Sequence, residues 1–475
     1  MIKLLYIDLF CGAGGTSTGV ELATLHGEKC AKVIACVNHD THAIASHLAN
    51  HPETKHFTED IRTLEMSPLV EITEKAREQY PGAKVVLWAS LECTNFSKAK
   101  GGQPRDADSR TLADHLFRYI EALDPDYIQI ENVEEFMSWG ALDDNGKPIS
   151  KEAGRDYVRW CEAVKRYGYQ YHYRLLNSAD FGAYTSRKRF FGQFVRDGLA
   201  GAFPMPTHDK KGGGLFGALP WKPVREVLDF SDEGESIFGR KKPLVEATLR
   251  RIYAGLVKFV GGGRESHLLV KYNSVNEPAG TITTKDHHAI ITYYGNGSMM
   301  SVEHPAPTVT THDRVAKVQV SFLANEYSGG GQLGSIDDVC PAILTTPKQK
   351  LASCFLMNPQ YNSAGGSVDN PCFTLIARMD KMPPYLVQTT EGVGIEVYED
   401  DSPMTRTIKE FMAAYGIIDI KMRMLKVSEL LAIMGFPRGY KLVGTQSEQK
   451  KFIGNAVEVT TSRRLCEALA ERITI

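Results

Sequence analysis

The sequence predicts an α/β protein whose mostly parallel sheet is interrupted by a β-rich insertion. Over residues 1–200, short apolar runs alternate with stretches of helical spacing. From about residue 200 Gly and Pro become frequent, as in KKGGGLFGALPWKP, and β-type segments replace the helical spacing. Helical patterning returns near Lys421. We therefore expect residues 1–200 and 421–475 to form one discontinuous domain, with residues 201–420 inserted as a second domain.

Four short apolar runs in the first part of the chain are the predicted strands. They are Lys3–Phe10, Ala31–Val37, Lys84–Ala89 and Tyr127–Ile130. The stretches with helical spacing are Thr16–Leu25, Thr111–Leu123, Lys426–Met434 and Val457–Arg472. Short apolar strands separated by helices indicate parallel βαβ units and a twisted sheet that is covered on both faces.

The insertion contains an internal repeat. Its copies are EPAGTITT at 277–284, HPAPTVTT at 304–311, VCPAILTT at 339–346 and a decayed NPCFTLIA at 370–377. Because Pro cannot donate inside a sheet while Thr and Ile favour strands, each copy predicts a turn followed by a strand. We interpret the repeat as scaffold; the alternative is that the polar tips after each strand contact a partner.

The composition indicates a folded protein that is not embedded in a membrane. The chain of 475 residues has 43% apolar and 24% charged residues, which suits ordinary hydrophobic cores and excludes wholesale disorder. It contains no run approaching the roughly 18 apolar residues of a membrane helix. Asp8 interrupts the apolar N-terminus before it could act as a signal peptide. We expect a cytoplasmic protein.

The Cys and His patterns predict neither a disulfide framework nor a metal site. Nine Cys without a C-x-x-C pair fit buried small side chains, apart from Cys93, which is treated below. Five His crowd one short stretch, namely His39, His42, His47, His51 and His56. His47 and His51 have i, i+4 spacing, but the Glu of H-E-x-x-H is absent, so we expect a polar helix face.

A glycine-rich turn follows the first predicted strand. The segment Asp8–Gly15 reads DLFCGAGG and joins that strand to the first helix. Glycines there allow the backbone to approach a ligand closely, at the carboxyl end of a strand, where doubly wound sheets bind cofactors. The G-x-G-G spacing differs from the dinucleotide fingerprint G-x-G-x-x-G, so by itself it is equally compatible with a tight turn.

Together with this turn, an ordered series of motifs resembles the DNA (cytosine-5) methyltransferase family. The motifs are DLFCGAGG, Asn38–Asp40 (NHD), Glu59–Ile61 (EDI), Ser90–Ser97 (SLECTNFS), Glu131–Val133 (ENV), Asn177–Phe191 (NSADFGAYTSRKRFF), Arg423–Pro437 (RMLKVSELLAIMGFP) and Gly454–Val457 (GNAV). ENV, SRKR and GNAV in this order are highly specific. The resemblance implies a Rossmann-like S-adenosylmethionine-dependent methyltransferase sheet with an inserted β-rich target-recognition domain.

The resemblance also implies S-adenosylmethionine as the cofactor, no metal, and a set of cofactor-binding positions. These are Asp8, Phe10, Gly12, Gly14, Asn38, Asp60, Ile61, Asn455 and Ala456. Asn38 lies where the family has an acidic ribose ligand; its amide can still hydrogen-bond a hydroxyl, but without charge assistance. The segment with Asp60 and Ile61 would meet the adenine.

The implied chemistry is a covalent route to C5 of cytosine, which is a poor nucleophile. A thiolate that adds at C6 turns C5 into an enamine-like carbon that can attack a methyl sulfonium, and Cys93 matches that nucleophile. Glu131 matches the carboxyl group that bonds ring N3. Arg187 and Arg189, two apart on an extended segment, suit a base carbonyl and phosphates. Because C6 is inaccessible inside a duplex, the base must be flipped out.

Three places depart from the family pattern. Glu92-Cys93-Thr94 stands where the family has Pro-Cys-Gln. Asn38 replaces the acid, and Thr185 replaces the Gln usually found two residues before the first arginine. Losing Pro frees a backbone angle, and an inward Glu92 would oppose thiolate formation. Three alternatives therefore stay open: the same chemistry on RNA, modification of an already modified cytosine, and a catalytically impaired DNA-binding relative.

The charge distribution favours DNA as the partner. The net charge is only −2, but residues 181–270 contain 15 Lys plus Arg against 9 Asp plus Glu. Binding of a polyanion depends on that local field more than on the total charge. Together with the resemblance, which implies a monomeric cytosine-5 methyltransferase of the kind found in restriction–modification systems and phages, this local charge predicts double-stranded DNA as the partner.

Overall fold

The computed structural model of the chain forms two compact units. The described residues are 1–91, 112–140, 149–150, 152–213, 217–259, 354–357, 365–376, 379, 383–391, 395–415 and 417–473, together with the backbone of the strands between 289 and 335. The first unit comprises residues 1–230, 366–384 and 425–475. The second comprises residues 231–365 and 385–424.

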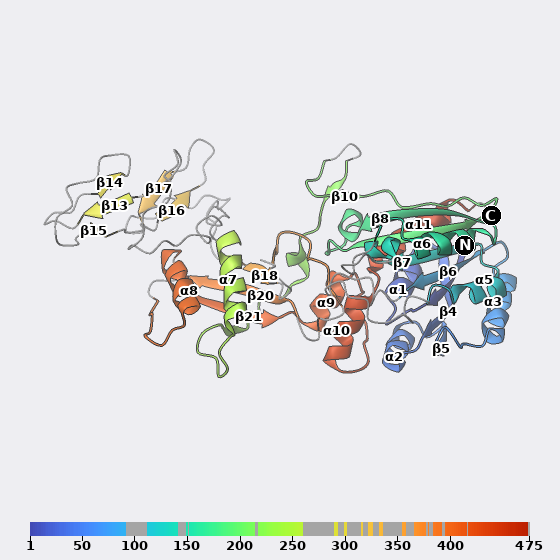
Figure 1. Cartoon of the computed structure of the whole chain (residues 1–475), viewed down its shortest axis with the longest axis horizontal. Coiled ribbons are helices and arrows are strands. Elements are labelled where there is room, and N and C mark those ends of the chain that lie inside the picture. The colour runs from blue at the N-terminus through green and yellow to red at the C-terminus, as the bar shows by residue number, and fades with distance from the viewer. Residues whose placement is uncertain are drawn as a thin grey trace. The chain divides into compact units, whose positions relative to one another are not determined.

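A seven-stranded sheet forms the centre of the first unit (Figure 1), in the order β5-β4-β1-β6-β7-β9-β8. The strands are β1 (Leu4–Leu9), β4 (Ala31–Asn38), β5 (Lys55–Thr58), β6 (Lys84–Ser90), β7 (Tyr127–Asn132), β8 (Tyr169–Asn177) and β9 (Lys188–Arg196). The strands β5, β4, β1, β6 and β7 are parallel to one another, and β9 is antiparallel to both β7 and β8. The chain runs outward from β1 to β5 and then returns to β6. This reversal creates a topological switch point at the carboxyl ends of β1 and β6.

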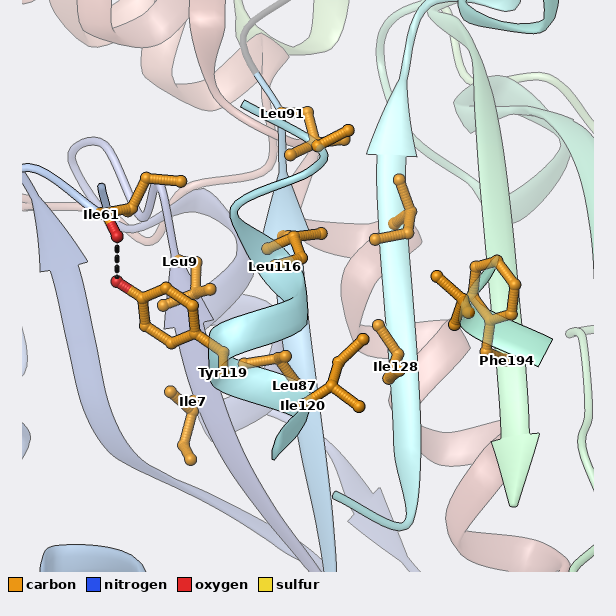
Figure 2. Packing of buried hydrophobic residues seen from close by; sticks show 14 of the residues in the cluster. Ile7, Leu9, Ile61, Leu87, Leu91, Leu116, Tyr119, Ile120, Ile128 and Phe194 are labelled. Carbon is orange, nitrogen blue, oxygen red and sulfur yellow. Dashed lines mark hydrogen bonds between the residues drawn. The ribbon is translucent and has the colours of Figure 1, made fainter. Parts of the chain in front are cut away.

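Helices cover both faces of this sheet. The helices of the first unit are α1 (Gly15–Glu21), α2 (Thr41–Asn50), α3 (Ser67–Gln79), α5 (Leu116–Leu123), α6 (Arg155–Lys165), α9 (Val427–Ile433), α10 (Gln446–Asn455) and α11 (Val459–Glu471), of which α9 and α10 pack against each other. On one face Leu87 and Ile128 pack against Leu116 and Ile120 of α5 (Figure 2). On the other face α1 packs against α11, so the C-terminal helix completes the N-terminal sheet.

The remaining elements of the first unit are short. They are β2 (Thr24–Leu25), β3 (Glu28–Lys29), β10 (His208–Asp209), β11 (Leu219–Pro220), β19 (Gly366–Ser367) and the 3-10 turns η2 (Glu134–Ser138), η3 (Ser178–Phe181) and η4 (Val224–Val227).

The second unit combines an antiparallel sheet with two helices. The strands β12 (Glu235–Ser236), β21 (Ile417–Met424), β20 (Tyr385–Glu391) and β18 (Cys354–Met357) are neighbours in that order. The helices α7 (Glu246–Phe259) and α8 (Pro403–Ala414) pack on them through Ile252, Leu256, Ile408 and Met412. Further strands are β13 (Ala289–Thr292), β14 (Met299–Ser301), β15 (Val315–Ala316), β16 (Phe322–Asn325) and β17 (Gln332–Ser335).

The predicted fold class is confirmed, and the four predicted apolar runs are β1, β4, β6 and β7. The first helix differs from its prediction: it ends at Glu21, and the hairpin of β2 and β3 follows. Two helices inside the insertion, α7 and α8, were not expected. The apolar spacing of α7 is present in the sequence, but the surrounding Gly and Pro residues obscured it.

The boundaries of the compact units lie elsewhere than the expected 200 and 420. Residues 201–230 pack with the first unit, where the Trp221 indole N–H donates to the Asp180 carboxylate at 2.9 Å. Residues 366–384 do so as well, since the Ser186 N–H donates to the Cys372 carbonyl at 2.8 Å. Three repeat copies lie outside the described residues, and the described part of the fourth contributes only an isolated bridge, at Cys372.

The Cys and His predictions have different outcomes. Six of the free Cys side chains of the described residues are buried, as expected. The prediction that the His residues form a polar helix face is wrong for His47, because this side chain is fully buried. The reason is that α2 packs on β4 and β5 and buries Ala43, Ile44 and His47 together. None of the described helices is both long and apolar enough to span a bilayer.

Candidate active site

The loop after β1 forms an open backbone cradle at the switch point. Phe10 and Gly12 have φ angles of 60° and 52°, so the chain turns sharply before α1 begins at Gly15. Among the described residues, no atom lies within 4 Å of a Cβ placed on Gly12, so this part of the chain leaves space there. A Cβ on Gly15 would lie 2.4 Å from the Val457 carbonyl oxygen. Because Gly12 has no side chain, the loop leaves room beside it for a ligand. Because Gly15 has none, the GNAV segment can pack closely against the loop.

A tyrosine from a distant segment holds the backbone of the cradle by a hydrogen bond. The Tyr440 hydroxyl, from the loop between α9 and α10, donates to the Ala13 carbonyl at 2.6 Å. The Thr18 hydroxyl donates to the Gly14 carbonyl at 2.6 Å. A Cβ on Gly14, whose φ is 99°, would lie 2.5 Å from the Tyr440 hydroxyl oxygen. No motif indicated Tyr440, because the matching C-terminal segment ends at Pro437.

The ends of β4 and β5 supply the next predicted cofactor residues. Asn38 is half-buried at the end of β4, and its side-chain oxygen accepts from the Asp40 N–H at 2.9 Å. Asp60 follows β5, where Arg62 donates to both carboxylate oxygens and lowers the pKa of that carboxyl group. The carbonyl of the buried Ile61 accepts from the Tyr119 hydroxyl at 2.9 Å (Figure 2). Asn38 and Asp60 are thus already oriented by hydrogen bonds.

The other predicted cofactor residues lie behind the cradle or beside it. Asp8 is fully buried on β1, and the Ser17 hydroxyl donates to it at 2.7 Å. Burial raises the pKa of Asp8 to about 8. Asn455 is the exposed last residue of α10, and Ala456 is its half-buried C-cap. The contacts of these three residues with a cofactor stay predictions.

A buried ion pair occupies the carboxyl end of β7. The Glu131 carboxylate lies 3.4 Å from Nε of Arg189, and both side chains are largely shielded from water. Burial raises the pKa of Glu131, while the positive charges of Arg189 and Arg187 oppose that shift. Because β9 is antiparallel to β7, the beginning of β9 lies beside the end of β7 and presents Arg189 there.

Arg187 has a different environment from Arg189. Its guanidinium is 3% exposed and donates to the carbonyls of Leu375 at 2.8 Å and of Gly454 at 3.3 Å. The side chain therefore joins three distant parts of the first unit. Its predicted contacts with a base carbonyl or a phosphate stay a prediction, and the observed contacts describe a positioning residue.

The ENV motif also holds the entry to the nucleophile segment. The Asn132 side-chain amide donates to the Leu91 carbonyl at 3.3 Å. Leu91 follows β6 and is the last described residue before Glu92, Cys93 and Thr94, which lie outside the described residues. The sequence indicated Asn132 only as part of the ENV motif. In the structure its side chain holds the backbone at Leu91.

Comparison with known proteins identifies the family. Residues 4–211 and 318–471 match the family model described as C-5 cytosine-specific DNA methylase. The chain belongs to this family. Type II methyltransferase M.AgeI of Thalassovita gelatinovora is 30% identical over 203 residues, and M1.HphI of Haemophilus parahaemolyticus is 28% identical over 212 residues.

These alignments with the curated relatives are partial. They cover 42% and 44% of this chain, and 42% and 50% of the two relatives, so the chain spans half or less of their length. The solved structure of Entamoeba histolytica methyltransferase EhMeth matches with a TM-score of 0.51 at 12% identity and covers 100% of both chains. This last likeness concerns the fold alone.

In this C-5 cytosine-specific DNA methylase family member, the predicted site residues gather in two groups along one sheet edge. The first group, which we call the cofactor half after its predicted role, lies at the ends of β1, β4 and β5 and contains Phe10, Gly12, Asn38, Asp60 and Ile61. The second group, which we call the base half after its predicted role, lies at the end of β7 and the beginning of β9 and contains Glu131, Arg187 and Arg189. The end of β6, which leads towards Cys93, separates the two halves.

Proposed function

We propose that this chain methylates C5 of cytosine in double-stranded DNA, with S-adenosylmethionine as the methyl donor. The buried pair of Glu131 and Arg189 carries the proposal. Glu131 is at the end of β7, and the neighbouring strand, β6, ends shortly before Cys93 in the chain. M.AgeI and M1.HphI are named Type II methyltransferases. We extend that role to this chain, as a monomeric partner of a restriction system.

S-adenosylmethionine fits the residues of the cofactor half. The open side of Gly12 admits a ligand against the loop backbone without a clash. The Asn38 amide can meet a ribose hydroxyl, and the partly exposed Phe10 side chain offers apolar surface for a flat ring. Bound there, the cofactor supplies an electrophilic sulfonium methyl group and leaves as S-adenosylhomocysteine.

Cys93 would form the covalent bond to the base. Its thiolate adds to C6, and the electrons of the C5–C6 double bond move to C5. C5 then forms the bond to the methyl group as the methyl–sulfur bond breaks. Water removes the C5 proton, the bond between C6 and sulfur breaks, and the double bond and the thiolate are restored. The nucleophile is thus regenerated in each turnover.

Glu131 would supply the proton that the ring requires. Addition at C6 places negative charge on the ring; Glu131 neutralises it by giving its proton to N3, and the carboxylate takes that proton back when sulfur leaves C6. Burial raises the pKa of Glu131, which favours the protonated form that donates to N3. Arg189 would hold the carboxyl group in place and offer its remaining N–H groups to the base carbonyl. These two side chains therefore act as one unit.

The second unit would contact the DNA. Lys241, Lys242 and Arg250 are exposed near the beginning of α7, within the basic stretch of residues 181–270. Such cations attract phosphates without requiring a base sequence. Because C6 must leave the duplex to reach a thiolate, binding includes flipping of the target cytosine.

An adduct experiment tests the proposal. Duplex DNA that carries 5-fluorocytosine is incubated with the protein and S-adenosylmethionine, because fluorine at C5 prevents the elimination step. We expect a covalent complex that survives denaturation and disappears in Cys93→Ala. Cys354→Ala, which changes a half-exposed thiol of β18, is the matched control and should retain the complex.

The same experiment discriminates among the alternatives. An adduct that forms only with single-stranded or folded RNA of the same sequence would replace DNA as the substrate. If the adduct formed only with a cytosine that already carries another modification, the substrate would be that modified base. Retained DNA binding without any adduct, on DNA of many sequences, would contradict the enzymatic proposal and favour a DNA-binding relative.

A further inference from the structure

Four thiol and imidazole side chains meet beneath the cofactor loop. Cys36 of β4 and His56 of β5 are register partners on adjacent parallel strands, so their side chains lie on the same face of the sheet. His47 comes from α2, which packs against both strands. Cys11 belongs to the cofactor loop, where its N–H donates to the Val37 carbonyl at 3.2 Å.

The spacing of these side chains suits a tetrahedral metal ion. Sγ of Cys36 lies 3.7 Å from Nδ1 of His47, which lies 2.9 Å from Nε2 of His56. The possible ligand atoms of Cys11, Cys36 and His47 all lie within 4.8 Å of one another. With zinc–sulfur bonds of ~2.3 Å and zinc–nitrogen bonds of ~2.0 Å, neighbouring ligand atoms are ~3.3–3.8 Å apart. The ligand atoms of Cys11, Cys36 and His47 therefore lie near that geometry, and His56 is the candidate for the fourth ligand because its Nε2 lies beside His47.

Ordinary packing does not explain this cluster. Cys36 and His47 are fully buried, and Nδ1 of His47 points at both Sγ of Cys36 and Nε2 of His56. The His47 ring also lies against the rings of His51 and His56, with centroids 4.7 and 4.9 Å away. Buried imidazoles that face one another without a counter-charge are poor core residues.

We propose that Cys11, Cys36, His47 and His56 bind one structural zinc ion. Two thiolates and two imidazoles are a donor set that favours zinc over harder cations. Four protein ligands leave no open position, so the ion has no part in the chemistry. Binding converts the two thiols to thiolates and releases two protons to the solvent.

The position of this site gives the ion a specific task. Cys11 lies between Phe10 and Gly12, so the ion would tie the cofactor loop to β4, α2 and β5. Asn38 and Asp60 follow two of the same elements. The zinc ion would thereby fix the relative positions of the cofactor residues, and this holds whether or not the chain methylates DNA. The prediction of no metal relied on spacing, which cannot show that Cys11 and Cys36 converge.

His51 is excluded from the ligand set by its contacts. Its Nε2 lies 3.0 Å from the Thr18 hydroxyl oxygen and 3.4 Å from that of Tyr440. These contacts direct that nitrogen towards α1 and the loop before α10, whereas His56 has its nitrogen beside His47. The choice of the fourth ligand can therefore be tested separately.

Metal content provides the test. The full-length protein is prepared with added zinc, and bound zinc is measured by elemental analysis after extensive dialysis. We expect one zinc per chain in the unaltered protein. Cys36→Ser and His56→Asn should each lose more than half of the bound zinc, and the double variant should bind no zinc. The matched controls are Cys30→Ala and His39→Asn, which change the same residue types outside the cluster and should retain one zinc.

A cobalt experiment covers the case in which a variant fails to fold. Cobalt replaces zinc in the unaltered chain, and its visible absorption reports tetrahedral geometry and thiolate ligation. We expect both signatures, together with a weaker affinity for S-adenosylmethionine, by about tenfold, after chelation. Zinc below one tenth per chain with no cobalt spectrum would overturn the proposal, as would a Cys11–Cys36 disulfide or full zinc content in the double variant.

Discussion

The cofactor half and the base half use the same sheet edge in different ways. The cofactor half is built from backbone geometry: Gly12 leaves space, and Asn38 is oriented by one hydrogen bond. The base half is built from charge, since Glu131 and Arg189 form a pair that is shielded from water. The first half therefore depends on shape and the second on electrostatics.

This difference predicts how each half responds to substitution. A backbone cradle is disturbed when a side chain is added, whereas a buried charge pair is disturbed when one partner is removed. Substitutions in the base half should change the reaction, and those in the cofactor half should change affinity for the cofactor. The variants below probe that separation, from the largest expected effect to the smallest.

Glu131→Gln should produce the largest effect. The amide cannot transfer a proton to ring N3, so we expect methyl transfer to fall by about a thousandfold, within the usual range for general acid catalysis. Binding of S-adenosylmethionine, measured by calorimetry, should change less than twofold. Glu134→Gln is the control, because Glu134 is exposed and its ion pair with Lys188 lies at the surface. An equal loss of cofactor binding in Glu131→Gln would remove the distinction between the halves.

Arg187→Ala and Arg189→Ala should separate positioning from catalysis. Arg187→Ala leaves the buried carbonyls of Leu375 and Gly454 without their charged donor, so we expect the free energy of unfolding to fall by about 2–4 kcal/mol. Arg189→Ala should lower activity by about a hundredfold with a stability loss below about 1 kcal/mol. Denaturant unfolding and methyl-transfer rates check both variants. The reverse pattern would assign the contact with the base to Arg187.

Gly12→Ala should weaken cofactor binding. Its φ of 52° suggests a backbone cost of about 1–2 kcal/mol for a residue with a Cβ. The added methyl group also points into the open cradle, so we expect a loss of affinity for S-adenosylmethionine of about tenfold or more. Gly27→Ala is the control: Gly27 has φ of 85° and equally open surroundings, but lies in the β2–β3 turn. If both variants lost the same affinity, the cradle assignment would fail.

The pH dependence of stability should show the smallest effect. Burial raises the pKa of Glu131 in the folded state, so its contribution to stability is fully present below the ordinary Glu pKa. That contribution is lost as the pH rises through the raised pKa. In Glu131→Gln the free energy of unfolding should therefore fall less steeply with rising pH above 5. A steeper fall than in the unaltered chain would show that Arg189 outweighs burial.

The sheet and the positions of the motifs could be predicted because their signals are local. The apolar run YIQI becomes the first part of β7, and the alternation of strands and helices indicated parallel order before any contact was known. Glu131 could be located because ENV follows that run directly. Glycines between a strand and a helix similarly located the cradle at Gly12.

Other features depend on contacts between distant parts of the chain. Arg187 contacts Leu375, which is 188 positions away, so no local pattern distinguishes it from Arg189. His47 was expected on a polar face, although the neighbouring strands cover it. Tyr440 supports Ala13 across 427 positions and carries no motif. In each case the partner that defines the role comes from another segment.

By itself, the sequence predicted the α/β fold class, the glycine turn after the first strand, and charged candidate residues next to predicted strands. Hydrophobic periodicity and glycine conformations act within a few residues, and they are therefore visible in a linear chain. The tertiary structure alone decided that Arg187 binds carbonyls while Arg189 meets Glu131, and that Cys11, Cys36, His47 and His56 converge. Burial and hydrogen-bond partners arise only when distant segments pack together, because they depend on distance in space rather than along the chain.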